Sequence, residues 1–110
     1  MITRYALFEG HVKPEETDAF RADVMKTILP HWLKFPGALE VRVTFSNERD
    51  EGAPEFPLIL AVDYPDRDSV DRALASDVRT RARAATEEVM SRYFVGKIHH
   101  HVTEANTYKI

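Results

Sequence analysis

Cysteine is absent from this sequence, and glycine is scarce, with four residues in a chain of 110. The lack of thiols excludes disulfides, thiolate metal sites and thiol nucleophiles. No apolar run approaches the roughly 18 residues that a membrane-spanning helix needs, and none resembles the apolar part of a secretory signal. We therefore expect a cytoplasmic protein with no membrane partner.

An excess of one charge is also missing. The 15 Lys and Arg residues nearly balance the 18 Asp and Glu residues, which leaves a net charge of −3. This balance provides no basic surface for nucleic acid, so we expect no nucleic-acid partner. The GxGxxG, Walker and GxSxG motifs are absent too, which leaves no sequence support for a nucleotide site or a serine nucleophile. What remains is simple binding or chemistry without a cofactor.

The composition itself is that of a globular chain, with 44% hydrophobic and 30% charged residues. A chain of this length fits one domain, residues 1–110. Because so small a domain buries a modest share of its surface, self-association is an expected further source of stability.

Hydrophobic periodicity predicts an order of strand, helix, strand, strand, helix, strand. The helix that begins at Pro14 should kink or break at Pro30, since proline lacks an amide N–H. The second helical region should divide into a short helix capped by Asp66 or Asp68 and a longer amphipathic helix after Ser76. The predicted strands are residues 3–10, 39–45, 58–64 and 96–103.

This order fits the split βαβ, or ferredoxin-like, α+β fold, in which a four-stranded antiparallel sheet carries both helices on one face. The opposite face is then bare. We expect Phe8, Leu58, Leu60 and Val62 to make that face too apolar for water. A second copy of the sheet would cover it, which predicts a homodimer.

The pattern resembles the dimeric α+β barrel superfamily, and within it the EthD-like branch, over nearly the whole chain. The resemblance rests on Phe20 followed by Pro30 and residues 36–39 (PGAL), on residues 60–64 (LAVDY), and on the broken second helix at residues 68–94. It implies two ferredoxin-like sheets packed face to face around a two-fold axis. The superfamily includes cofactor-free monooxygenases, cyclases, isomerases and haem enzymes. Many such proteins carry a His two residues before the matching proline, where this chain has Ile28.

Two histidines are the candidate catalytic residues. At 100° per residue, His31 lies about 20° from Phe20 on the helix, which would point it toward the sheet. His100 alternates with Ile98 and Val102, which places it on the helix side of the last strand. The two imidazoles would then meet in one pocket, where one abstracts a proton and the other polarises a carbonyl. The alternative is that both are ordinary structural histidines.

Small residues in the long helix, Ala82 and Ala85, allow either close packing or a cavity between helix and sheet. If a cavity forms, the residues expected to line it and bind a ligand are aromatic: Tyr5, Trp32, Phe35 and Tyr93. Glu9 is a possible carboxylate partner for a His if it faces the helices with Tyr5.

His99 and His101 share the other face of the last strand and have the spacing of a metal-binding pair. A catalytic zinc site needs a third ligand, and no motif supplies one, so we expect no metal site.

These features predict a protein that binds a small apolar or aromatic metabolite. If the protein is an enzyme, it would transform this metabolite without a cofactor, as a monooxygenase, cyclase or isomerase does. The alternative is a non-catalytic dimeric ligand-binding or structural module.

Overall fold

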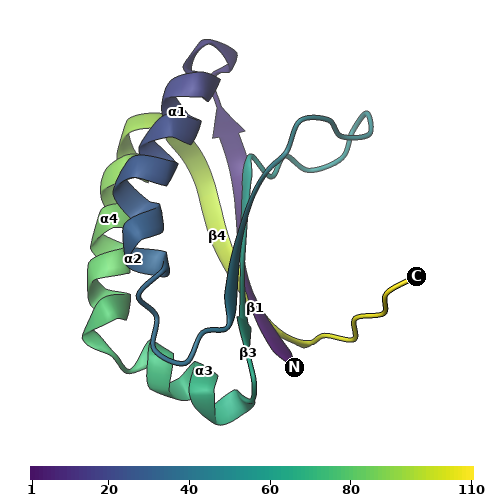
Figure 1. Cartoon of the computed structure of the whole chain (residues 1–110). Coiled ribbons are helices and arrows are strands. Elements are labelled where there is room, and N and C mark those ends of the chain that lie inside the picture. The colour runs from purple at the N-terminus through teal and green to yellow at the C-terminus, as the bar shows by residue number, and fades with distance from the viewer.

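The computed structural model describes all 110 residues and shows one sheet with every helix packed on the same face (Figure 1). Four strands form the sheet, and six helical segments cover it. The elements in chain order are β1 (Ile2–Val12), η1 (Pro14–Glu16), α1 (Thr17–Asp23), η2 (Val24–Ile28), α2 (Leu29–Trp32), β2 (Glu40–Phe45), β3 (Leu58–Tyr64), α3 (Arg67–Leu74), α4 (Asp77–Tyr93) and β4 (Phe94–Glu104).

The sheet is antiparallel throughout, in the order β2-β3-β1-β4. The two central strands β1 and β3 pair with each other from Ile2 opposite Tyr64 to Phe8 opposite Leu58. This arrangement is the predicted ferredoxin-like α+β fold, which is thereby confirmed. No helix in it has the length and apolar character that crossing a bilayer would require.

The side chains of β1 and β3 face the helices in the opposite parity to the one expected. Phe8, Leu58, Leu60 and Val62 are 0–6% exposed and lie in the core beneath the helices, so their predicted place on the bare face is wrong. The bare face instead carries an apolar centre of Tyr5, Leu7, Ile59 and Ala61, given by the cross-strand register. The parity was ambiguous because β1 and β3 are apolar at both odd and even positions.

The first helical region passes Pro30 without breaking. Ahead of it, η2 (Val24–Ile28) is one turn of π-helix, in which the Leu29 N–H donates to the Val24 carbonyl five residues earlier. A π-turn holds one more residue than an α-turn, so every later residue is rotated by one position. The buried positions accordingly recur every four residues, at Phe20, Val24, Ile28 and Trp32.

Candidate functional site

A pocket of about 390 Å³ lies between the sheet and the helices. Its sheet side is formed by β1, β3 and β4, and its helix side by α2, the residues just after α2, and α4. Ten of its sixteen lining residues are hydrophobic, which is typical of a site for a small organic molecule. The hydrophobic lining residues include Ala6, Trp32, Phe35, Leu60, Val62 and Ala82.

Three of the residues predicted for a site are brought together here. Trp32, Phe35 and His100 all line the pocket. Trp32 faces inward because of the π-turn before it, and it is only 3% exposed. The cavity above Ala82 also exists, as the small side chain permitted.

Tyr5 and Tyr93 do not line the pocket, so that part of the prediction is wrong. Tyr5 lies on the opposite face of the sheet, because it pairs with Ala61 and His101 in the other parity. Tyr93 is at the far end of α4, where its hydroxyl donates to a carboxylate oxygen of Asp23 at 2.7 Å. That bond and burial raise the pKa of Tyr93.

His31 is not part of the pocket either, and it does not meet His100. The prediction assumed a regular α-helix, whereas the extra residue of η2 gives the inward position to Trp32. His31 is half-buried beside it, and its Nδ1 atom is buried without a hydrogen-bond partner.

His100 is the one histidine that reaches the pocket. It stands on β4 between Ile98 and Val102, opposite Ala6 of β1. Burial lowers the pKa of His100 from about 6.5 to about 4, and the positive charges of Arg4 and Arg79 act in the same direction. The imidazole is therefore neutral at physiological pH and can accept a proton or a hydrogen bond.

Sequence analysis missed the charged residues of the pocket: Arg4, Arg79, Arg83 and Glu87. It also missed Tyr64, which is 2% exposed and whose pKa is raised by burial. A signal for Arg4 was present, because it alternates with Ala6 and Phe8 and so shares their core-facing parity. Arg79 follows likewise because it lies three residues before Ala82, and Arg83 and Glu87 follow because they lie four and eight residues after Arg79.

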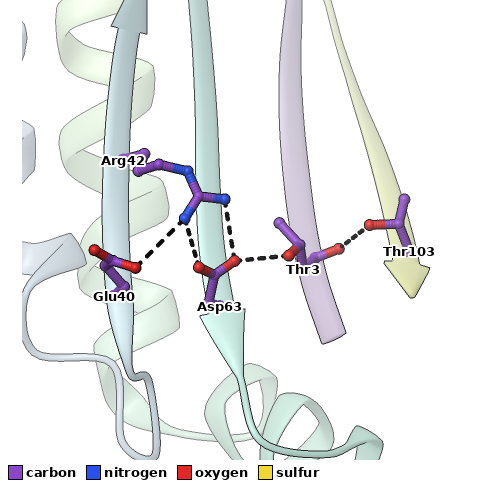
Figure 2. Close-up of polar contacts among 5 residues, drawn as sticks. All are labelled: Thr3, Glu40, Arg42, Asp63 and Thr103. Atoms are coloured by element: carbon purple, nitrogen blue, oxygen red, sulfur yellow. Dashed lines mark hydrogen bonds and ion pairs between the residues drawn. The ribbon is translucent and has the colours of Figure 1, made fainter. Parts of the chain in front are cut away.

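The bare face of the sheet carries a polar network around a buried carboxylate (Figure 2). Asp63 is 1% exposed, and Arg42 donates to both of its oxygens at 2.5 and 3.1 Å. The Thr3 hydroxyl donates to Asp63 at 2.6 Å, and the Thr103 hydroxyl donates to the Thr3 carbonyl at 2.8 Å. The bonds from Arg42, followed by the bond from Thr3, lower the pKa of Asp63 and keep it ionised.

His99 and His101 lie on this same face, as their alternation with His100 predicted. A ring nitrogen of His99 is 2.8 Å from a carboxylate oxygen of Glu9. Glu9 is thus a partner of a histidine, although on the face away from the helices. No group of three or more His, Cys, Asp or Glu side chains is arranged to hold a metal ion.

The chain is similar to several solved structures. No protein-family model and no curated protein matches the sequence. An EthD (ethyl tert-butyl ether D) family protein from Bacillus halodurans superposes with a TM-score of 0.70 at 24% identity, over 96% of this chain and 99% of that chain. This chain has the EthD-like fold.

Two further structures are similar to this chain over nearly their whole length. The cofactor-independent oxygenase SnoaB from Streptomyces nogalater gives a TM-score of 0.59 at 17% identity, over 97% of this chain and 94% of that one. A dimeric protein of unknown function and ferredoxin-like fold from Bacteroides fragilis gives 0.65 at 14% identity, over 94% and 95%. The resemblance predicted from sequence is confirmed at the level of the fold.

One departure from the EthD-like pattern can now be placed in space. Ile28, which stands where many EthD-like proteins carry a His, is fully buried in the core and does not line the pocket. The histidine that lines the pocket of this chain is instead His100, on the last strand.

Proposed function

We propose that this protein is a homodimer in which each subunit binds a small apolar or aromatic metabolite in the pocket between sheet and helices. The observation that carries the proposal is the pocket itself, about 390 Å³ in volume, bordered by aromatic side chains that include Trp32 and Phe35 and by one neutral imidazole. Trp32 and Phe35 offer flat apolar contact to a ring system. His100 supplies a single polar group that can orient such a molecule.

The chemistry that these residues support is proton transfer without a cofactor. A neutral His100 can take a proton from an acidic C–H or O–H group of a bound molecule. The hydroxyl of Tyr64, a side chain in the same lining, can donate a hydrogen bond to the oxygen on which charge develops. The structural neighbour described as a cofactor-independent oxygenase supports chemistry without a cofactor.

The dimer is proposed from the bare face of the sheet. Its centre, formed by Tyr5, Leu7 and Ile59, is only half-buried in a single chain, and no helix covers it (Figure 1). Apolar patches of this kind mark interaction sites. The loop at residues 46–57 and the tail at residues 105–110 both project to this side of the sheet, where each would reach around a second copy. A structural neighbour described as dimeric supports the same assembly.

Binding can be tested with N-phenyl-1-naphthylamine, a neutral aromatic probe that becomes fluorescent in apolar pockets. We expect saturable binding with one site per chain, together with a shift of the indole N–H signal in NMR spectra. The chain has one tryptophan, Trp32, so this signal reports on the pocket alone.

A pair of variants on one helix provides the control. Ala82→Leu places a larger side chain in the pocket and should abolish probe binding while the protein stays folded, since the cavity accommodates the added atoms. Ala84→Leu makes the same change at an exposed position of α4 and should bind as the unmodified protein does. Equal binding by both variants would instead favour the alternative, a dimeric module whose interior takes no ligand.

A further inference from the structure

Two arginines of the pocket lack the carboxylate partner that five of the ten arginines of this protein have. Arg42, Arg49, Arg67, Arg83 and Arg92 each form an ion pair with an Asp or Glu side chain. Arg4 and Arg79 form none, although both line the pocket. Arg79 donates only a long bond of 3.4 Å to the Leu74 carbonyl, and Arg4 makes no side-chain hydrogen bond at all.

The surroundings of Arg4 destabilise its unpaired positive charge. Arg4 is half-buried on the helix side of β1, and the charged groups acting on it most strongly include two further cations, Arg79 and Arg67. Burial and these like charges lower the pKa of Arg4. Buried charges in proteins are ordinarily paired, so an unpaired guanidinium that borders a cavity points to a partner that enters the cavity.

The net charge of the pocket lining is positive. Arg4, Arg79 and Arg83 are positive, His100 is neutral, and Glu87 is the single acidic side chain. Glu87 is already held by Arg83 at 3.3 Å, so it leaves both other arginines free. The remaining surface is apolar and would contact the rest of a ligand.

We propose that the ligand of this pocket is an amphiphilic anion, an aromatic or alicyclic ring system with one acidic group, such as a carboxylate, held by Arg4 and Arg79. This inference rests on the proposed function, which names only a small apolar or aromatic molecule. A guanidinium binds a carboxylate through two parallel hydrogen bonds, which fixes orientation as well as charge. The ring system would then lie against Trp32 and Phe35, with His100 beside it.

Two probes that differ mainly in the charged group separate the two proposals. 8-Anilino-1-naphthalenesulfonate carries the same aryl rings as N-phenyl-1-naphthylamine plus one sulfonate. We expect the anionic probe to bind at least about tenfold more tightly at low salt, as charge-assisted hydrogen bonds in a partly desolvated site allow. Added sodium chloride should weaken the anionic probe and leave the neutral one unchanged.

Arginine variants identify the residues responsible. Arg4→Gln and Arg79→Gln should each remove most of the preference for the anion without weakening the neutral probe. Arg4→Lys keeps the charge and should retain part of the preference. Arg81→Gln is the matched control, because Arg81 lies on the same helix as Arg79 and is exposed as Arg79 is, but does not line the pocket.

The outcomes are distinct. An anion preference that Arg4→Gln and Arg79→Gln remove, and Arg81→Gln does not, supports the inference. Equal affinity for the two probes, or a preference indifferent to Arg4 and Arg79, overturns it and leaves the proposed apolar pocket standing. Failure of both probes to shift the Trp32 indole signal overturns the inference and the proposed function together.

Discussion

At the scale of single residues, partial burial in the pocket shifts the pKa of His100. Its pKa of about 4 in the folded chain lies below the value of about 6.5 expected when the chain is unfolded. As pH falls below 6.5 the unfolded chain therefore takes up this proton first. The stability that neutral His100 contributes is fully present above pH 6.5 and is lost as pH falls toward 4.

We predict that His100→Gln reduces the loss of stability between pH 7 and pH 4.5. The expected difference from the unmodified protein is about 1 kcal/mol, because His100 is more than a third exposed and solvent screens part of the effect. Urea denaturation at a series of pH values measures it. His101→Gln, on the other face of the same strand, is the control and should follow the unmodified curve.

Other groups begin to titrate just below this pH range, which is why the comparison must be between variants. Asp63 and Asp23 have lowered pKa values, through bonds from Arg42 and from Tyr93 respectively. Their contributions are present above the pKa of an unfolded Asp and are lost at lower pH. If His100→Gln and the unmodified protein lost stability in parallel, the imidazole would not be desolvated in the pocket.

At the scale of elements, the π-turn η2 decides which aromatic side chain enters the pocket. Buried positions at intervals of four, from Phe20 to Trp32, do not fit 3.6 residues per turn. The extra residue of η2 brings them back onto one face. Pro30, which cannot donate an amide hydrogen bond, follows directly in the first turn of α2, where its lack of an N–H is tolerated.

We predict that deletion of Lys26, an exposed residue of η2, converts this turn to α-helix and keeps the fold. The buried side chains would then recur at intervals of four, three and four, which is the α-helical pattern. The expected cost in the free energy of unfolding is below about 1 kcal/mol, since no core side chain is lost. Circular dichroism with urea denaturation measures it.

Deletion of Ala84 in α4 serves as the control. Ala84 is equally exposed, but α4 is regular, so the deletion rotates Ala85 and Val89 out of the core. We expect a loss of more than about 3 kcal/mol, or no folded protein at all. If the two deletions had the same effect, the π-turn would not be the source of the register at Trp32.

At the scale of the whole molecule, the proposed dimer explains why the bare face has an apolar centre and a polar border. Tyr5, Leu7 and Ile59 would meet their counterparts near a two-fold axis, because such an interface pairs one patch with itself. The ion pair of Arg42 with Asp63 lies toward the edge strand β2, where it would border the interface.

We predict that Leu7→Glu separates the subunits, since the two-fold axis would bring two buried carboxylates together. Sedimentation should give a particle of twice 12.6 kDa for the unmodified chain and of 12.6 kDa for the variant. Leu33→Glu makes the same substitution at an exposed leucine at the end of α2 and should remain a dimer. A 12.6 kDa particle for the unmodified chain at high concentration would refute the assembly.

The sequence determined the elements of this protein, because their periodicity is local. Strict alternation marked β2, the apolar stripe marked α4, and Asp66 caps α3 by accepting a hydrogen bond from the Ser69 amide at 2.8 Å. The order of these elements then left few ways to fold them, and the ferredoxin-like sheet followed. The lining of the pocket was predictable only in part, through Trp32, Phe35 and His100.

Only the tertiary structure decided which way the ambiguous elements face. β1 is apolar at odd and even positions alike, so packing against the helices, and not its own pattern, sends Phe8 into the core and Tyr5 to the bare face. Which side chains of the helix after Val24 face the sheet depends on the burial of Trp32 against strands distant in the sequence. The π-turn gives the inward position to Trp32 and not to His31. The unpaired state of Arg4 likewise exists only in three dimensions, because whether a charge has a partner depends on residues remote in the chain.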